Sequence, residues 1–426
     1  MKNKEIKTWL GVWWIYSKED NQKHVRVNGM LSITDEGDME LKLEPTSSEN
    51  SFRCKSNTSY TIWGVDEYSI KITLFEVYPK NYNSSYGLTT LLVNYALVGE
   101  HVSSLDIPIF NRVTVKYYNL KEFLFVPQVE MSSEKDFVLF KVKSSKKNKF
   151  SIPIDKETNW VLEGNYHWRA EHRCQEVYIQ QDTDFTIESL SKKSINEFNK
   201  QIREFSDFLS LALQGKQHPY RICFLSSSDN LHTVDFYYSL EKSDKCRCHL
   251  IGNSIPIERL SAIMRNWHEN YAQISPIYSY LERSSFSNNG VLGIPEFLLV
   301  EFALEGYFKR FHNKTKTNGK DLRKLKDQIR TLLDYYANID IIANLNLDID
   351  TIVGTRDAYT HLFPDDEKKG YEIQDMHQLW INMEKIKILL LCCILDSMGF
   401  THKEIDINFK TAPILNPEAY QNNIVF

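Results

Sequence analysis

The sequence predicts an α+β chain of several parts: an N-terminal antiparallel β-rich domain, a mixed middle region and a C-terminal helical bundle. Three observations predict this order. Apolar residues alternate with polar ones over much of residues 1–185, they recur at helical spacing from Ile195 onward, and they line successive helix faces after Pro295. The length of 426 residues allows two or three domains.

Residues 1–185 contain short runs with a period of two, the pattern of strands that bury one face. The first two runs flank a polar turn at 35–38 and predict a β-hairpin. We therefore expect an antiparallel sandwich or a barrel-like domain, with Trp13 and Trp14 in an aromatic core. The alternating positions are Val25, Val27, Leu31, Ile33, Met39, Leu41, Leu43, Tyr68, Ile70, Ile72, Leu74, Leu91, Val93, Tyr95, Leu97, Val113, Val115 and Tyr117.

A basic run within this part has two interpretations. It is either a solvated hairpin tip or a contact for RNA or a phage component. Its cations are Lys141, Lys143, Lys146, Lys147 and Lys149.

Residues 186–288 mix helical and strand-like patterns. A helix is predicted from residue 195, ending near Gly215 with Pro219 beyond it. A strand-like run at 234–238 and an amphipathic run at 257–271 follow, and the Ser, Asn and Gly residues of 284–290 are typical of a linker. The apolar face of the first helix consists of Ile195, Phe198, Ile202, Phe205 and Leu209.

Residues 289–426 contain four helical patterns with short connections, which predict a bundle. Pro295 suits the start of the first helix, a second begins near Asp321, a third contains residues 350–361, and a fourth spans 371–398. The face of the first helix is formed by Phe297, Leu298, Glu301, Phe302, Leu304, Glu305 and Phe308.

Charge and cysteine content limit the function classes. A net charge of -5 argues against a surface covered in nucleic-acid contacts, so any RNA site must be a local patch. Seven cysteines without a disulfide-like framework fit a reducing cytoplasm. The longest apolar run, 388–395, is far shorter than the roughly 18 residues of a membrane helix, and the charged residues 1–7 are unlike a signal peptide. We therefore expect a cytoplasmic protein with no membrane association.

Residues 356–361 place a permanent cation, a carboxylate, a phenol and an imidazole within six positions, as Arg356, Asp357, Tyr359 and His361. RNA cleavage by internal transfer must remove a proton from the 2′-OH, protonate the leaving 5′-oxygen and stabilise the extra charge on phosphorus. An imidazole serves the proton steps, and such help is worth roughly 10²- to 10⁴-fold. An arginine suits the phosphate because it donates two parallel hydrogen bonds. This chemistry requires no metal and no cofactor.

The geometry of this segment raises a problem. Asp350 suits the N-cap of a helix, and Pro364 should end that helix before it. On a regular helix, residues five positions apart point about 140° from each other, so Arg356 and His361 of one chain would not converge. Either the helix loosens near His361, or two copies of the chain build one site.

The arrangement of Arg, a polar residue, further positions and His between two helices of a bundle resembles the HEPN ribonuclease motif. The spacing alone is weakly specific, and the helical context supports it. The wider sequence, including Trp13-Trp14, residues 27–31 and residues 208–212, resembles the ApeA-type HEPN proteins of bacterial anti-phage defence. The resemblance implies an ApeA-like N-terminal region over 1–288, divided at 185, and a HEPN nuclease domain over 289–426.

By this resemblance we expect the protein to be a metal-independent endoribonuclease of abortive infection. Arg356 would stabilise the phosphate, His361 would act as acid and base, and Asp357 would orient the imidazole. HEPN nucleases typically dimerise through this region, so we favour a homodimer whose two Arg/His pairs share one cleft. The partner would be RNA, with transfer RNA and messenger RNA both open. The N-terminal region would sense a phage-derived trigger or restrain the nuclease. Asp357 stands where many relatives have Asn, which we do not interpret as inactivating.

Further residues are expected to support this site. Tyr359 either stacks on a base or fills the core, and Glu305 lies on an apolar face where it needs a partner, for which Arg356 is the candidate. A basic segment around Asp321 either contacts RNA phosphates or forms a solvated loop. Its cations are Lys309, Arg310, Lys314, Lys316, Lys320, Arg323, Lys324 and Lys326.

Two other functions compete with the nuclease. A non-catalytic HEPN module would bind RNA or a partner without cutting, and it should tolerate His361→Ala. A metal hydrolase could use Cys246, Cys248 and His249, although no second pair lies at zinc-site spacing. We interpret that cluster as structural, and we expect no metal site.

Overall fold

The computed structural model describes the following parts of the chain: 7–16, 25–34, 37–44, 58–82, 89–124, 129–134, 137–142, 149–171, 176–226, 232–239, 242–246, 248–251, 255–286, 293–312, 324–361 and 376–412. The chain divides into two compact units. The first, the β unit, comprises Met1–Ser206 and Gln217–Asp244. The second, the helical unit, comprises Asp207–Lys216 and Lys245–Phe426.

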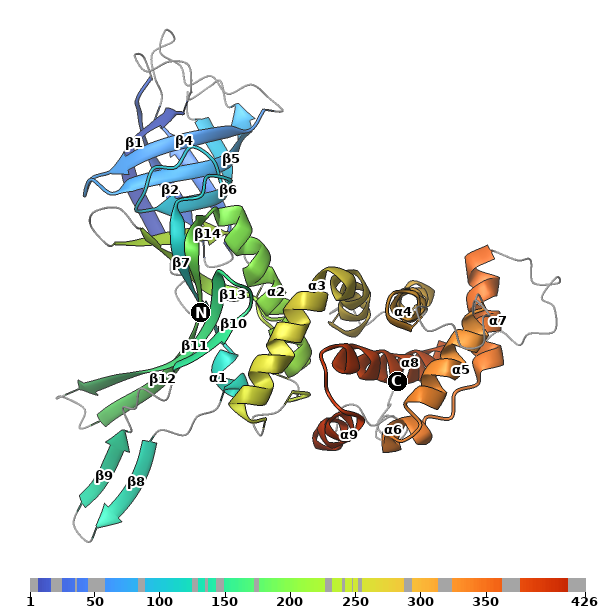
Figure 1. Cartoon of the computed structure of the whole chain (residues 1–426). Helices are drawn as coiled ribbons and strands as arrows, with labels where there is room; N and C mark the ends of the chain where they lie inside the picture. The colour runs from blue at the N-terminus through green and yellow to red at the C-terminus, as the bar shows by residue number, and fades with distance from the viewer. Residues whose placement is uncertain are drawn as a thin grey trace. The chain divides into compact units, whose positions relative to one another are not determined.

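The β unit is built from antiparallel strands (Figure 1). Twelve of them form one continuous sheet in the order β10-β11-β12-β7-β13-β14-β6-β3-β2-β1-β4-β5. The strands are β1 (Lys7–Ile15), β2 (Val27–Ile33), β3 (Met39–Leu43), β4 (Tyr60–Asp66), β5 (Lys71–Tyr82), β6 (Thr89–Val98), β7 (Phe110–Tyr117), β10 (Lys149–Pro153), β11 (Thr158–Glu171), β12 (Glu176–Lys193), β13 (Pro219–Ser226) and β14 (Thr233–Tyr238). A short helix α1 (Leu120–Phe123) and a separate hairpin of β8 (Val129–Glu134) and β9 (Phe137–Val142) also belong to the unit.

Six strands close into a barrel, because β6 pairs with β5 along one edge and with β3 along part of the other. The predicted hairpin is confirmed as β2 and β3, and the barrel-like alternative is confirmed over the sandwich. The centre of the barrel is filled by a cluster of buried side chains that includes Trp13, Leu31 and Leu74. Gly64 lies against this tryptophan, and a Cβ there would stand 2.2 Å from the ring, so only glycine fits.

Three details of the sequence prediction were wrong. Val25 is exposed and precedes β2 instead of belonging to it. Trp14 is only half-buried, because consecutive strand residues point to opposite faces; its ring lies 5.6 Å from that of His101 on the outside of the barrel. Tyr68 and Ile70 are exposed and precede β5 instead of belonging to it. The Asp66 carboxylate accepts the N–H groups of both, at 2.9 and 2.7 Å, and so forms a turn.

The rest of the sheet carries its own core. The sheet leaves the barrel at β6, whose residues 95–98 pair with β14. Helix α2 (Ile195–Leu213) begins in the β unit, where Phe205 stacks on Phe185 of β12 with ring centroids 3.6 Å apart. The hydroxyl of Ser206 lies 2.9 Å from that of Tyr117 on β7. The strand predicted at 234–238 is confirmed as β14.

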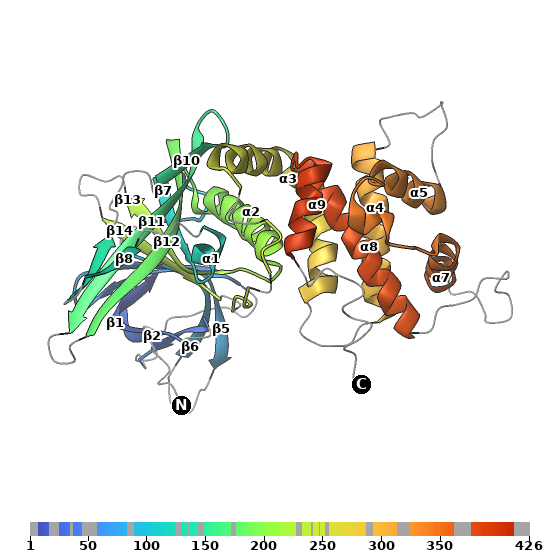
Figure 2. The same cartoon turned by 90° about the horizontal axis from the view of Figure 1, so that it is seen from below.

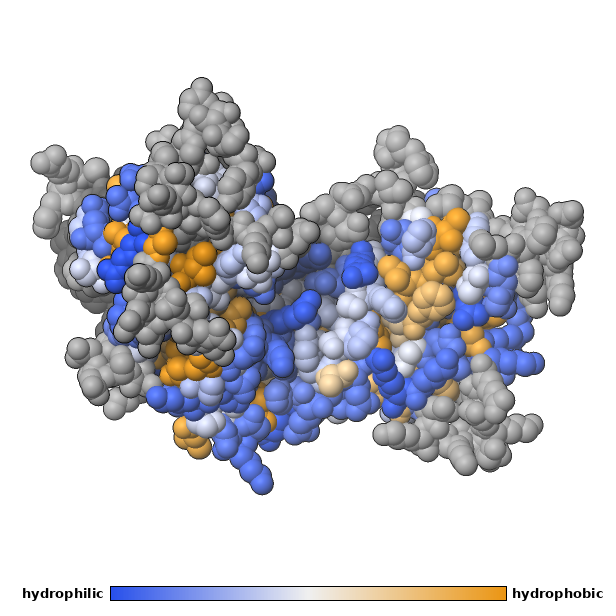
Figure 3. Space-filling view, turned by 90° about the horizontal axis from the view of Figure 1, so that it is seen from above, coloured by the Kyte–Doolittle hydropathy of each residue, from blue (hydrophilic) through white to orange (hydrophobic). Residues whose placement is uncertain are grey.

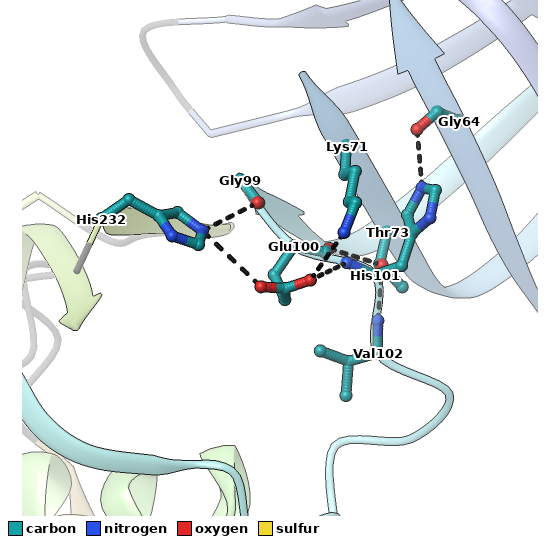
Figure 4. A network of polar contacts seen from close by, with 8 residues as sticks. All are labelled: Gly64, Lys71, Thr73, Gly99, Glu100, His101, Val102 and His232. Atoms are coloured by element: carbon teal, nitrogen blue, oxygen red, sulfur yellow. Dashed lines mark hydrogen bonds and ion pairs between the residues drawn. The ribbon is translucent and has the colours of Figure 1, made fainter. Parts of the chain in front are cut away.

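A polar network fastens the segment after β6 to the barrel (Figure 4). The Thr73 hydroxyl donates to the carbonyl of Glu100 at 2.9 Å and accepts the N–H of Val102 at 3.1 Å. Nε2 of His101 lies 2.9 Å from the carbonyl oxygen of Gly64. Burial lowers the pKa of His101, so the ring is neutral at pH 7 and Nε2 carries the proton donated to that carbonyl.

The helical unit is organised around α8, which packs against α3, α4 and α9 (Figure 2). In the described part of this unit the helices are α3 (Ile257–Phe286), α4 (Ile294–Tyr307), the π-helix η3 (Phe308–His312), α5 (Leu325–Tyr335), α6 (Asp340–Ala343), α7 (Ile349–His361), α8 (Met376–Ser397) and α9 (His402–Thr411). No helix among these residues is long and apolar enough to span a membrane.

The prediction of four bundle helices was incomplete. It missed α6 and α9, although Thr401 and Glu404 form a capping box at the start of α9. The predicted linker begins three residues too early, since residues 284–286 still belong to α3. The carbonyl of Ser284 accepts a hydrogen bond from the buried Lys387 ammonium at 2.9 Å, which holds this last turn in place.

Arg259 joins α3 to α9, and we expect its removal to lower the free energy of unfolding. Its guanidinium donates to both carboxylate oxygens of Glu404, at 2.8 and 2.7 Å, and lowers the pKa of that carboxyl to about 2. The pair is partly exposed, so Arg259→Ala should lower the free energy of unfolding by only about 1 kcal/mol. A carboxyl with a lowered pKa contributes stability above its ordinary value of 4.5 and loses it as the pH falls toward 2. Chemical denaturation at pH 7 and pH 2.5 should therefore show that the free energies of unfolding of wild type and Arg259→Ala differ less at pH 2.5 than at pH 7.

Candidate functional site

The candidate site lies where α7 contacts α4. The start of α7 is fixed by Asp348, whose carboxylate accepts the N–H of Thr351 at 3.1 Å and its hydroxyl at 2.6 Å. The predicted cap, Asp350, was wrong: it lies within the first turn and forms an ion pair with Lys326. The helix continues through His361, and Pro364 lies outside the described residues.

Arg356 is held between two carboxylates from different helices. Its Nη1 donates to Asp357 at 2.8 Å, and its Nη2 donates to Glu305 on α4 at 3.2 Å. The guanidinium carbon lies 5.9 Å from the ring centroid of Phe302. The side chain is 19% exposed, so the cation is largely desolvated yet still reaches the surface. The structure thus brings Arg356, Asp357 and Glu305 together.

His361 is exposed on the last turn of α7. Because the helix is regular from residue 356 to 361, the two motif side chains of one chain diverge by about 140°. No loosening of the helix before His361 is seen among the described residues, and the segment from 362 to Pro364 lies outside them. Asp357 stands one helical turn before His361, but its Oδ1 accepts a hydrogen bond from Arg356.

The structure describes only some of the remaining predicted residues. Tyr359 is half-buried on α7. Lys309, on η3, donates to Glu305 at 2.6 Å, and Arg310 donates to the carbonyl of Gln273 on α3 at 2.7 Å. Lys314 and Lys316 lie outside the described residues, as do Lys320 and Arg323. Most of the basic run at 141–149 does as well.

Glu301 was overlooked as a site residue by the sequence analysis, which placed it only on the face of the first bundle helix. It is 1% exposed, and neither carboxylate oxygen has a hydrogen-bond partner among the described residues. Burial raises the pKa of this carboxyl to about 8, although the Arg356 charge opposes the rise. The sequence signal that could have identified Glu301 was its position one helical turn before Glu305 on a mostly apolar helix.

No alternative metal centre emerges from the described residues. The Cys246 sulfur lies 3.8 Å from Nε2 of His249, and Cys248 is buried, which raises the pKa of its thiol to about 11. No set of three or more His, Cys, Asp or Glu side chains in the described part of the chain could hold a metal ion.

The surface next to Arg356 is apolar. Helix α4 is apolar nearly all round, and the described neighbours leave part of its apolar surface uncovered. Phe302 is 38% exposed, and Leu298 and Leu299 are half-buried. Figure 3 shows an apolar patch, coloured orange, over the part of the helical unit that holds α4.

Comparison with protein families then places the chain. A family model described as ApeA N-terminal domain 1 matches residues 8–267. The chain belongs to this ApeA family. A second model, described as Apea-like HEPN, matches residues 298–404. No curated protein and no solved structure matches the chain.

The two ApeA matches divide the elements between them. The N-terminal match contains most of β1 and all of β2 to β14 and extends into α3. The HEPN match contains Glu301, Glu305 and the whole of α7, and therefore both Arg356 and His361.

Proposed function

We propose that this ApeA-family chain is a metal-independent endoribonuclease that acts in anti-phage defence by abortive infection. The observation that carries the proposal is the pair Arg356 and His361 on one helix of the HEPN-matched region, with the cation desolvated and the imidazole exposed. HEPN domains are generally ribonucleases, which supports this assignment over other uses of the same residues.

The proposed reaction is internal transfer at phosphorus. An imidazole of His361 takes the proton of the 2′-OH, the 2′-oxygen bonds to phosphorus, and the bond to the 5′-oxygen breaks. A second imidazole protonates the leaving oxygen, so the products are a 2′,3′-cyclic phosphate and a 5′-hydroxyl. Arg356 donates hydrogen bonds to the phosphate oxygens as negative charge develops on them. Every step uses groups of this chain.

We propose that two copies of the chain build the site. The 140° divergence on a regular α7 supports this, because it separates Arg356 from His361 of the same copy. The exposed Phe302 next to Arg356 also supports it, since an apolar patch beside a polar site suits an interface. A two-fold pair is the commonest oligomer.

The N-terminal region is proposed to restrain the nuclease or to sense a phage-derived trigger, with RNA, such as transfer RNA, as the substrate. The match to ApeA N-terminal domain 1 supports a shared architecture with that family. A toxic nuclease must be held inactive until it is needed, which makes a regulatory part reasonable.

The test is incubation of purified protein with total RNA in EDTA, beside His361→Ala. We expect only the wild type to cut, with ends that carry 2′,3′-cyclic phosphate, and a loss of at least about 10²-fold in the variant because acid–base help is removed. The assay is repeated with lysate from phage-infected cells to supply a trigger. Cleavage that persists in the variant, or that stops in EDTA, would contradict the proposal.

The competing function is a HEPN module that binds RNA or a partner without cutting. The observation that favours it is that Glu305 and Asp357 already neutralise Arg356. RNA binding that requires Arg356, together with no cleavage by wild type under either condition, would select this alternative.

A further inference from the structure

We propose that Glu301 is a positioning residue that sets whether Arg356 is available to an RNA phosphate: uncharged, it leaves the guanidinium to the substrate, and ionised, it withdraws the guanidinium into the contact between α4 and α7. The inference rests on the proposed binding of phosphate by Arg356 and assigns a role to a carboxyl that the proposed reaction does not use.

The first support is a pair of unsatisfied polar groups. Both oxygens of Glu301 and the Nε–H of Arg356 are buried without a hydrogen-bond partner in the described part of the chain. A guanidinium has five N–H donors, and Glu305 and Asp357 engage Nη2 and Nη1. The Nε–H of Arg356 is therefore the donor that these two carboxylates leave unused.

The second support is the charge around the guanidinium. Lys309 and Arg356 together carry two positive charges, which Glu305 and Asp357 balance. An uncharged Glu301 keeps this group neutral, so a phosphate can approach. An ionised Glu301 makes the group net negative in a desolvated setting, where like charges repel strongly, and it adds a third carboxylate that competes for Arg356.

The third support is the protonation state. The groups that act on Glu301 are Arg356 and Asp357 from α7 and Glu305 from its own helix. Burial outweighs the attraction of Arg356, and the pKa of about 8 keeps Glu301 uncharged at pH 7. A carboxyl with a raised pKa stabilises the fold fully below its ordinary value of 4.5, and that contribution is lost as the pH rises toward 8.

The experiment separates binding from chemistry by using the full chain with His361→Ala, which cannot perform the proton steps. The probe is a fluorescent single-stranded oligoribonucleotide of adenosine and cytidine only, whose bases do not lose protons over the range used. Its dissociation constant is measured from pH 6.5 to pH 9. We expect affinity to be constant to about pH 7.5 and to fall about tenfold by pH 9, because about nine-tenths of a carboxyl is ionised one pH unit above its pKa.

Adding Glu301→Gln supplies an uncharged side chain of the same shape. It should abolish the alkaline loss of affinity and leave binding at pH 6.5 unchanged. The matched control is Glu258→Gln, an exposed glutamate on α3, which should keep the loss. Thermal melts of the same proteins should give Glu301→Gln a higher Tm than its parent. The difference in Tm should increase from pH 6 to pH 8.5.

The outcomes distinguish the two proposals. If Arg356→Ala in the same background binds the probe as well as its parent, the phosphate role of Arg356 fails. If Arg356→Ala weakens binding but affinity is independent of pH, or the alkaline loss survives Glu301→Gln, the role of Glu301 is overturned and the nuclease proposal stands.

Discussion

Arg356→Lys is expected to lower the rate of RNA cleavage by about 10²- to 10³-fold, the usual cost of removing one donor to a developing oxyanion. Lysine keeps the positive charge but loses the planar fork that donates to two phosphate oxygens. The ammonium still balances Glu305 and Asp357, so the fold should persist. Single-turnover cleavage assays with circular dichroism melts measure both effects.

Arg330→Lys is the matched control, because Arg330 is exposed on α5. It should cut RNA at the wild-type rate. Cleavage by Arg356→Lys at the wild-type rate would contradict a bidentate phosphate role and leave Arg356 as a structural cation. Arg356→Ala is a poorer probe, since it strands Glu305 and Asp357 near the buried Glu301 and should also destabilise the helical unit.

Trp13→Ala is expected to lower the free energy of unfolding of the β unit by about 3–5 kcal/mol, the range for removing a large buried aromatic side chain. Trp13 is fully buried at the centre of the barrel, and Gly64 contacts its ring. The cavity cannot collapse without moving closed strands. Urea denaturation followed by tryptophan fluorescence, with β-sheet circular dichroism as a second probe, measures the change.

Trp14→Ala is the control, because it removes the same side chain from the adjacent position on the opposite face of β1. Trp14 is half-buried against His101 and Arg26, so its loss should cost about 1 kcal/mol. Equal effects of the two substitutions would mean that the barrel interior is not the core of the β unit.

Local sequence patterns predicted the individual strands and helices of this fold better than they predicted which strands pair with each other. Alternation predicted strands β2, β3, β6 and β7, because one face of each is buried. The pairing of β6 with β3, which closes the barrel, and the addition of β14 to the same sheet join residues that are distant in the chain, and no local period encodes such pairing. Similarly, α9 was overlooked despite its capping box, because its apolar face is short.

The same limit applies to the candidate site. The chemistry of Arg356 and His361 was visible from residue types and spacing, and Glu305 was identified from its place on an apolar helix face. Glu301 occupies the same face one turn earlier. Only the packing of α4 in three dimensions distinguishes a partnered carboxylate from a fully buried carboxyl with a raised pKa, so its role could not be predicted from sequence.

The divided edge of β6 has a consequence for how the chain is made. Residues 95–98 pair with β14, which leaves the ribosome only after the long stretch that contains β7 to β13. At about 5–20 residues per second, the delay is on the order of ten seconds. During that time the edge of β6 at residues 95–98 stays unpaired on the barrel, a template for wrong pairing with other nascent chains. Slow synthesis between β6 and β14 should therefore favour aggregation, and this interval is where a chaperone would have most to protect.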